Sequence, residues 1–398
     1  MTQPVDGTES PRARVSFLSQ SSTAASGRAL RPSAKVLPEH ARGHNRALVL
    51  QSLFTTGQRS RADVARSTGL TRVTVSELVT ELMAEGLLVE IGQRGGARPG
   101  KPAILLDIDH SSFQVVGVDL SDFAVFRGAV LDLRGNIVRR AELPLTGITG
   151  QAALDRVVAL TERLLALVSA PLLGIGVGSP GIVDLAGLVV TAPNLEWTNV
   201  PLQAYLFERF GVPVVVANDA NAAVLAEHSF GDAREDLMLV RIGRGVGAGL
   251  LLGGGPLYGS RFAAGEIGHV VVGTDGGEQC SCGKQGCLET WIAVPRLEAK
   301  LMDAPSEAGR DDVLREAAGR LGIALAPIVG ALNLGEVVLS GPGQILGGLF
   351  VDATLETIRS RTMAPFHGDL TLRLTTLGDD IVLRGAAVMV ISARLGVS

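Results

Sequence analysis

The chain has 398 residues, of which 46% are hydrophobic and 19% are charged. This length predicts two or three domains, and the apolar content excludes a wholly disordered chain. The longest uncharged run, residues 164–183, contains two prolines and four glycines, so it indicates helix, turn and strand and not a membrane span. Because the first residues show no secretory signal, we expect a cytoplasmic protein without a membrane segment.

Charge is distributed unevenly along the chain. Residues 1–102 contain 14 Arg and Lys against 8 Asp and Glu, a net charge of +6. Residues 103–398 contain 22 against 32, a net charge of -10. A basic front joined to an acidic body indicates a nucleic-acid module attached to a second function, with a chance excess of arginine as the alternative.

The N-terminal part of the chain predicts an arm followed by short helices. Residues 1–44 are rich in Ser, Ala, Pro and Arg and lack periodicity, which is typical of a flexible basic arm. Leu50 and Leu53 mark the apolar face of a first helix. Ser60 and Asp63 have the spacing of a capping box, which predicts the start of a second helix.

A third helix and a hairpin complete this region. Thr71 can cap the helix, which then carries apolar residues at positions i, i+3, i+4 and i+7 before Gly86 ends it. Two apolar runs, residues 87–91 and 103–106, flank a Gly/Arg-rich turn and predict a β-hairpin. The order helix, helix, helix, hairpin predicts a winged helix-turn-helix DNA-binding domain over residues 45–107. The apolar stripe of its third helix consists of Val75, Leu78, Val79 and Leu82.

The third helix and the wing are the expected DNA contacts. The leading end of the helix would enter the major groove, and arginine between glycine and proline in the wing suits a narrow minor groove, which predicts A/T-rich flanks. A winged helix that serves only dimer contacts is the alternative. The candidate base readers are Thr71, Arg72, Val73, Ser76 and Thr80, and the candidate wing contacts are Arg94, Arg98 and Lys101.

Beyond residue 107, apolar strands alternate with helices and glycines, which predicts an α/β fold. Residues 115–119, 124–132 and 137–143 read as a meander of three strands. A second block of strands is expected at residues 237–242, 247–252 and 337–339. Residues 108–398 are therefore predicted to form two related lobes with a cleft between them.

All three cysteines of the chain fall within eight residues. Cys280, Cys282 and Cys287 follow His269, and three thiolates with one imidazole make a complete tetrahedral zinc site. Four protein ligands leave no position for a catalytic water, so the Zn²⁺ would be structural. A disulfide would leave one thiol unpaired, and three incidental buried cysteines are the remaining alternative.

These motifs resemble the ROK family of bacterial sugar kinases and sugar-responsive transcription regulators. The signature reads G-E-I-G-H at residues 265–269 and C-x-C-G-x-x-G-C-L-E at residues 280–289, and the resemblance runs from about residue 45 to 387. The loop from His269 to Cys280 is one residue longer than is usual in the family. The resemblance implies a winged helix-turn-helix followed by a two-lobed, actin-like and ribonuclease H-like ATPase-type fold, with the zinc loop at residues 269–287.

A sugar pocket is expected where a strand of residues 212–217 ends in Asn218 and Asp219, since ligands bind at the carboxyl ends of strands in α/β folds. Taken alone, Asp219 reads equally well as a helix N-cap. Carboxylates and amides suit a polyhydroxylated ligand, because each hydroxyl donates and accepts a hydrogen bond. By resemblance, the residues around the sugar are Gly178, Asn194, Asn218, Asp219, Glu266, His269 and Glu289.

The sequence departs from the kinases of the family at their phosphate loops. The counterpart of Asp219 is the general base of those kinases, which carry D-x-G-G-T where this chain has residues 119–123, ending in Asp122 and Phe123. In the second loop, residues 242–247, Arg244 replaces the usual threonine. The chain is thus expected to keep a vestigial base without kinase activity.

The resulting hypothesis is a sugar-responsive transcription regulator, a repressor, that binds double-stranded DNA at an inverted repeat as a homodimer or homotetramer and responds to a sugar or sugar phosphate. An active glucokinase-like sugar kinase with a fused DNA-binding domain is the enzyme alternative. A zinc-dependent interaction scaffold is the third.

Overall fold

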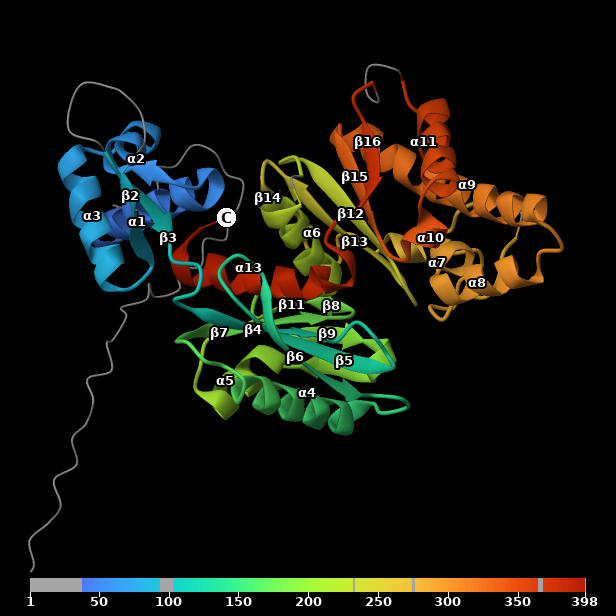
Figure 1. Cartoon of the computed structure of the whole chain (residues 1–398). Helices are drawn as coiled ribbons and strands as arrows, with labels where there is room; N and C mark the ends of the chain where they lie inside the picture. Colours follow the sequence, from blue (N-terminus) through green and yellow to red (C-terminus); the bar gives the residue numbers. More distant parts are fainter. Residues whose placement is uncertain (1–37, 94–102, 232, 274–275, 364–367, 398) are drawn as a thin grey trace, which may run out of the picture. The chain divides into compact units, whose positions relative to one another are not determined.

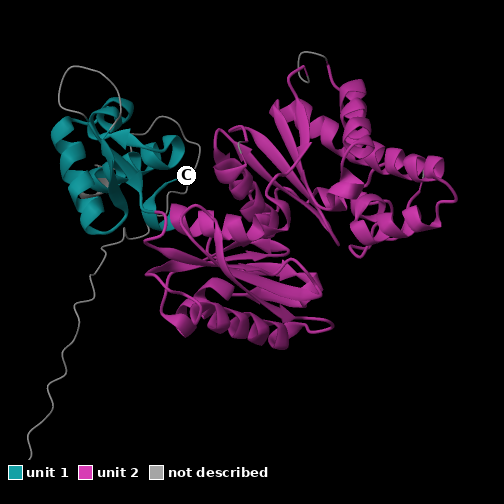
Figure 2. Cartoon of the chain, in the orientation of Figure 1, with its two compact units in different colours: residues 1–109, 393–397 teal, residues 110–392, 398 magenta. Residues whose placement is uncertain are grey.

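The chain divides into two compact units in the computed structural model, which describes residues 38–93, 103–231, 233–273, 276–363 and 368–397. Unit 1 comprises residues 1–109 and 393–397, and unit 2 comprises residues 110–392 and 398 (Figure 2). The division lies two residues beyond the expected boundary at 107. Residues 393–397 belong to the N-terminal unit, although they were expected in the sugar-binding domain. Of the helices in the described ranges, none has the length and apolarity to cross a bilayer.

The described residues of unit 1 form three complete helices, the last residues of the C-terminal helix and a three-stranded antiparallel sheet of order β1-β3-β2. Helix α1 begins at Pro38, so residues 38–44, expected to be part of a flexible arm, are helical instead. The expected hairpin is present, with its second strand ending at Ile108 and not at residue 106. The elements are α1 (Pro38–Thr56), β1 (Arg59–Ser60), α2 (Arg61–Thr68), α3 (Arg72–Ala84), β2 (Leu88–Gln93) and β3 (Ile104–Ile108).

Local capping fixes the two helices of the helix-turn-helix. The Ser60 hydroxyl accepts a hydrogen bond from the Asp63 N–H while the Asp63 carboxylate accepts from the Ser60 N–H, which confirms the predicted capping box. Helix α2 ends at Gly69, whose φ of 72° is in the left-handed region that favours glycine. The Thr71 hydroxyl accepts from the Thr74 N–H, so Thr71 is the N-cap of α3 as predicted.

Unit 2 consists of two lobes with the same strand topology (Figure 1). In each lobe the central strand of the sheet pairs with an antiparallel strand on one side and with a parallel strand on the other, and each of these neighbours pairs with one further strand in the same sense. The sheet orders are β11-β7-β4-β5-β6 and β14-β13-β12-β15-β16, and each lobe has its own hydrophobic core. The prediction of two related halves is therefore confirmed.

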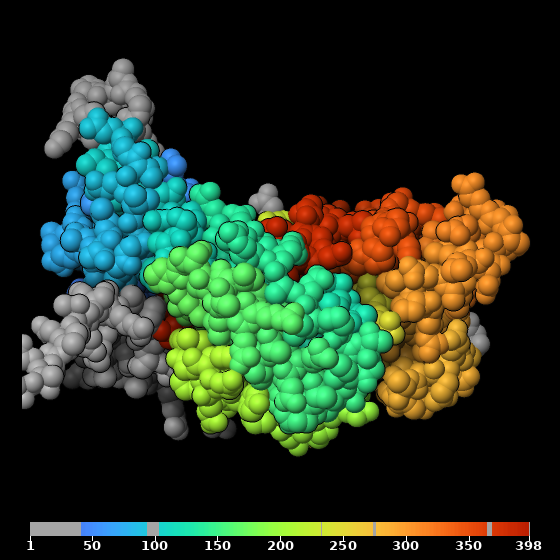
Figure 3. All heavy atoms as spheres, turned by 60° about the horizontal axis from the view of Figure 1, so that its bottom comes forward, coloured from blue at the N-terminus to red at the C-terminus, as the bar shows by residue number. Residues whose placement is uncertain are grey.

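The first lobe contains the five-stranded sheet, two helices and a small sheet of order β10-β9-β8. Its surface is visible in green in Figure 3. Its elements are β4 (Gln114–Asp119), β5 (Val125–Leu131), β6 (Ile137–Pro144), α4 (Gly150–Leu165), β7 (Leu172–Ser179), β8 (Ile182–Val183), β9 (Val189–Ala192), η1 (Pro193–Leu195), β10 (Trp197–Val200), α5 (Leu202–Phe210) and β11 (Val214–Asn218).

The second lobe follows helix α6 (Asp219–Phe230) and includes the long helix α9, which packs against α11. Its elements are β12 (Leu237–Ile242), β13 (Val246–Leu252), β14 (Gly255–Pro256), η2 (Ile267–His269), α7 (Leu288–Ile292), α8 (Val294–Asp303), α9 (Glu307–Leu332), β15 (Glu336–Ser340), α10 (Gly343–Leu346), α11 (Leu349–Arg361), β16 (Thr371–Leu374) and η3 (Gly378–Asp380).

The C-terminal helix α13 (Ile381–Leu395) packs closely on the first-lobe sheet and against α6 (Figure 1). A Cβ added at Gly176 would lie 2.1 Å from the Ala386 carbonyl oxygen, and one added at Gly385 would lie 1.9 Å from the Ala222 carbonyl oxygen. Glycine at these two positions thus permits the backbones to touch. This packing fixes the start of α6, where Asp219 lies.

Candidate functional site

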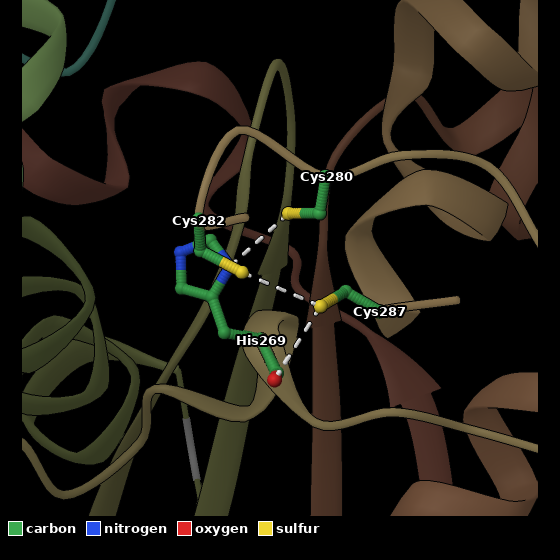
Figure 4. A group of neighbouring side chains, drawn as sticks. All are labelled: His269, Cys280, Cys282 and Cys287. Atoms are coloured by element: carbon green, nitrogen blue, oxygen red, sulfur yellow. Dashed lines mark hydrogen bonds between the residues drawn. The ribbon is translucent and has the colours of Figure 1, made fainter. Parts of the chain in front are cut away.

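Four side chains form a compact cluster in the second lobe. The ligand atoms of His269, Cys280, Cys282 and Cys287 all lie within 4.8 Å of one another. The Cys280 Sγ is 3.5 Å from the His269 Nδ1, and the Cys282 Sγ is 3.6 Å from the Cys287 Sγ (Figure 4). The second separation is far longer than a disulfide bond of about 2.05 Å, so the cysteines are free thiols.

The donor set of this cluster fits a tetrahedral zinc ion. Zn–S bonds of about 2.3 Å in a tetrahedron place the sulfurs about 3.8 Å apart, close to the separations in the cluster. Burial raises the pKa of Cys287 to about 12, whereas a hydrogen bond with the Lys284 backbone lowers the pKa of the exposed Cys282. The three thiols of this cluster would lose their protons on binding zinc and coordinate it as thiolates.

The loop that carries the cysteines is shaped by glycines and by a tryptophan. Gly276 and Gly277 have φ values of 97° and 123°, and a Cβ at Gly277 would lie 2.5 Å from the Gly286 Cα. Glycine at position 277 thus permits the two strands of the loop to approach closely. Trp291 packs beside it, with Arg320 at 4.0 Å and Lys300 at 4.9 Å from its ring centroid.

Asn218 and Asp219 lie where β11 ends and α6 begins. The Asn218 carboxamide oxygen accepts hydrogen bonds from the Ala220 and Asn221 N–H groups, and its nitrogen donates to the Gly181 carbonyl. Asn218, and not Asp219, is therefore the N-cap of α6. Its amide fixes the strand-to-helix turn that presents Asp219.

Asp219 forms an ion pair that sequence patterns did not reveal. The Arg241 Nη1 lies 2.5 Å from the Asp219 Oδ2, and the other terminal nitrogen of Arg241 donates to the Ser121 hydroxyl at 3.2 Å. Burial raises the pKa of Asp219, the Arg241 guanidinium opposes this rise, and the Asp119 carboxylate reinforces it. The sequence signal that could have identified Arg241 as a site residue is its position as the one charged residue of the otherwise apolar strand β12.

The Glu266 carboxylate lies near the carboxylates of Asp219 and Glu289. Burial raises the pKa of Glu266, and the neighbouring carboxylates of Asp219 and Glu289 raise it further, whereas His269 lowers it. Glu266 immediately precedes η2, which ends in His269, so this carboxylate and one member of the Cys/His cluster share one turn. The Glu289 Oε2 accepts from the Val246 N–H at 3.1 Å. The structure thus brings three of the predicted sugar contacts together.

The counterparts of the two phosphate loops face each other. Ser121 and Phe123 belong to the segment after β4, and Arg244 belongs to the turn between β12 and β13. The Arg244 guanidinium stacks 5.4 Å from the Phe123 ring centroid. In the first segment, the Asp119 carboxylate accepts from the Ser121 N–H. Arginine side chains thus connect these two segments.

The other predicted site residues are placed as follows. Gly178 in β7 approaches Asp219, because a Cβ there would lie 3.6 Å from the Asp219 Cα. Asn194 is exposed in η1. The wing residues Arg94, Arg98 and Lys101 lie outside the described residues. The predicted base readers of α3 are all exposed, including Val73 at 68%, whereas the apolar stripe of the same helix is buried.

Known proteins share this sequence pattern. The model of the ROK family matches residues 115–393. The xylose repressor of Caldicellulosiruptor bescii is 28% identical over 88% of this chain and 96% of its own length. The glucokinase of Halalkalibacterium halodurans is 31% identical over 69% of this chain and 94% of its own, and the regulator NagC of Escherichia coli is 32% identical over 65% and 64%.

Solved structures share the fold. A ROK family transcriptional regulator, a homologue of the E. coli MLC protein, superposes with a TM-score of 0.78 over 90% of this chain and 98% of its own, at 23% identity. A ROK glucokinase from Streptomyces griseus, in complex with glucose and AMPPNP, superposes with a TM-score of 0.61 over 69% of this chain and 98% of its own, at 25% identity.

Proposed function

Because the chain belongs to the ROK family, we propose that it is a sugar-responsive, DNA-binding transcriptional repressor. The observation that carries this proposal is the pairing of a winged helix-turn-helix, whose third helix exposes polar residues and Val73, with a carboxylate-lined site in unit 2. Relatives named as xylose repressors match nearly their whole length, including the N-terminal region, which supports the same function.

The residues proposed to bind DNA lie on helix α3 and on the wing. Val73 presents an apolar side chain that suits a thymine methyl group, and Arg72 suits phosphate or guanine. The basic charge of residues 1–102 provides the non-specific attraction to DNA. We propose an inverted-repeat operator with A/T-rich flanks, bound by a homodimer or homotetramer in the cytoplasm. The proposed contacts are Thr71, Arg72, Val73, Ser76, Thr80, Arg94, Arg98 and Lys101.

The residues proposed to bind the sugar surround Asp219. Glu266 and Glu289 would accept hydrogen bonds from sugar hydroxyls, with Asn218, Gly178, Asn194 and His269 nearby. A structural zinc ion on His269, Cys280, Cys282 and Cys287 would hold His269, and through η2 the adjacent Glu266, in place. The effector would act by preferring one arrangement of the two lobes over another.

Phosphoryl transfer is not part of the proposed function. Its transition state requires closely spaced backbone N–H groups around the phosphates, and residues 119–123 offer a carboxylate and a phenyl ring instead. In addition, Asp219 is held in an ion pair with Arg241. Purified protein with ATP, Mg²⁺ and a sugar panel is expected to show no turnover, and robust turnover would favour the glucokinase-like alternative.

The proposal is tested with sugar and DNA on the same protein. A thermal-shift screen against sugars and sugar phosphates, led by xylose, glucose and N-acetylglucosamine, identifies the effector. Selection from random duplexes then identifies the operator. We expect stabilisation by one sugar that is lost in Glu266→Ala, and a change in operator affinity when that sugar is added. A protein that selects no DNA sequence and binds no sugar would refute the proposal and favour a zinc-dependent scaffold.

A further inference from the structure

The side chains of two arginines in the second lobe contact residues of the first lobe. Arg241 extends from β12 and joins the Asp219 carboxylate to the Ser121 hydroxyl, at 2.5 and 3.2 Å. Arg244 extends from the next turn and stacks on Phe123. Ser121 and Phe123 are two of the positions at which the chain departs from the kinase loop, so the arginines occupy the region between the two phosphate-loop counterparts.

We propose that Arg241 is a positioning residue of the sugar pocket, which holds Asp219 as a fixed, ionised acceptor. Arg244 stabilises the segment of Ser121 and Phe123 by stacking on the Phe123 ring. This inference rests on the proposed function, because it assigns a task to Arg241 in the binding of sugar at Asp219.

The charges around Asp219 explain why such a residue is needed. Both Asp219 oxygens already accept a hydrogen bond, Oδ1 from the Ala220 N–H and Oδ2 from Arg241, and each keeps a second lone pair for a sugar hydroxyl. Arg241 is the cation that faces this carboxylate, whereas Asp119 and Glu266 face it as acids. A buried carboxylate among other carboxylates takes up a proton unless a cation compensates.

The expected consequence is that sugar affinity depends more strongly on pH when Arg241 is replaced. In Arg241→Met, burial and Asp119 would raise the pKa of Asp219 further, so Asp219 would become a neutral donor as the pH falls. A carboxylic acid then presents a proton where the sugar hydroxyl needs an acceptor.

The experiment is calorimetric titration of the full chain with whichever of D-xylose, D-glucose and N-acetylglucosamine binds the parent protein most tightly. Between pH 6 and 9 we expect the parent affinity to change less than that of Arg241→Met, since the Arg241 guanidinium opposes protonation of Asp219. The Arg241→Met protein should bind at least about tenfold more weakly at pH 6 and regain affinity as the pH rises.

Three further proteins make the result specific. Arg241→Lys keeps the positive charge and should recover most of the affinity, and Asp219→Asn in the Arg241→Met background should remove the additional pH dependence that Arg241→Met introduces. Arg139→Met removes an exposed arginine of β6, whose guanidinium hydrogen-bonds the adjacent Val138 carbonyl, and should bind as the parent does. Circular dichroism of each protein establishes that it is folded.

The outcomes separate the two proposals. A parent that binds sugar, together with an Arg241→Met protein of equal affinity at every pH, would overturn this inference and leave the proposed function standing. Equal weakening of Arg241→Met and Arg241→Lys at all pH values would also overturn it, because it would show a packing role without charge. A parent that binds none of the probes would overturn the proposed function and this inference with it.

Discussion

At the scale of single residues, Thr71 illustrates how a capping role limits a recognition role. Its hydroxyl accepts from the Thr74 N–H and contacts the Thr74 hydroxyl at 2.9 Å. A hydroxyl engaged in this way has less capacity to contact a base. Thr71 therefore determines where α3 begins, and we expect its contribution to the proposed base contacts to be smaller than that of the exposed residues that follow it.

Replacement of Thr71 tests this distinction. Thr71→Ala should lower the free energy of unfolding of unit 1 by about 1 kcal/mol, because α3 loses its N-cap, whereas Thr71→Ser should keep most of it. Urea unfolding followed by helix circular dichroism measures the difference. If Thr71→Ala unfolds as the parent does and still loses operator affinity, the hydroxyl acts on DNA and not on the helix.

The ion pair of Arg140 and Asp380 gives a second test, in the acid range. Its two hydrogen bonds are 2.6 Å each, and the Arg140 guanidinium lowers the pKa of Asp380 below its usual value. The pair therefore stabilises the fold above the ordinary pKa of an aspartate, and this contribution is lost as the pH falls through the lower folded value.

We expect Arg140→Met to lower the free energy of unfolding at pH 7 by about 1 kcal/mol or less, since the pair is partly exposed. The difference from the parent should vanish toward pH 3. Urea titrations at several pH values measure it, with Arg139→Met as the exposed control. A difference that stays constant down to pH 3 would show that Arg140 acts through packing.

Residue-scale features differ in how far the sequence predicts them. The capping box of Ser60 and Asp63 and the αL residue Gly69 are local, so a short window of sequence is enough. Arg241 is different, because its partners are 22 and 120 residues away and only the packing of two lobes brings them together. The members of the Cys/His cluster are predictable because three of the four lie in one loop.

At the scale of elements, the hydrophobic pattern predicted the strands well. The strands expected at residues 115–119, 237–242 and 337–339 correspond to β4, β12 and β15, to within one residue at each end. Element boundaries that depend on contacts elsewhere were less predictable. The start of α1 at Pro38 is an example, because residues 38–44 carry no apolar periodicity.

The loop from η2 to α7 carries the proposed zinc ligands, so loss of the metal from this loop is an informative test. The parent protein should contain one zinc ion per chain, measured by elemental analysis, and Cys287→Ser should lose it. Chelation should lower the melting temperature of unit 2, since zinc binding contributes folding free energy. Sugar affinity should fall with it, because Glu266 immediately precedes η2, the turn that ends in His269.

A matched control for the loop is Ser281→Ala, which changes a residue between two ligands without removing a thiolate. It should keep the zinc and the sugar affinity. Unchanged sugar affinity in the zinc-free protein would contradict the proposal that the metal maintains the pocket.

At the scale of the whole molecule, the chain end is part of unit 1, the unit proposed to bind DNA. Residues 393–397 belong to unit 1, Leu395 and Val397 are buried, and a Cβ added at Gly396 would lie 3.1 Å from the Ala47 Cβ. No local pattern indicates this, because the contact joins positions far apart in the sequence. Helix α13 begins among residues of unit 2 and ends among residues of unit 1.

Deletion of residues 393–398 tests the role of this segment. We expect unit 1 to lose stability by about 2–5 kcal/mol, comparable to emptying one buried leucine position, and operator affinity to fall. Limited proteolysis and operator titration measure the two effects, and deletion of Ser398 alone is the control. Unchanged protease resistance of unit 1 would show that the segment contributes nothing to it.

Trp197 and Trp291, the two tryptophans of the chain, provide one intrinsic fluorophore in each lobe of unit 2. Trp291 packs against the cysteine loop with Arg320 and Lys300 over its ring, whereas Trp197 is buried in the first lobe and its indole N–H donates to the Gly150 carbonyl. Emission from a Trp197→Phe protein would therefore report changes at the cysteine loop, and emission from a Trp291→Phe protein would report changes in the first lobe. The emission of unlabelled protein can thus show which lobe changes its tryptophan environment when a sugar binds.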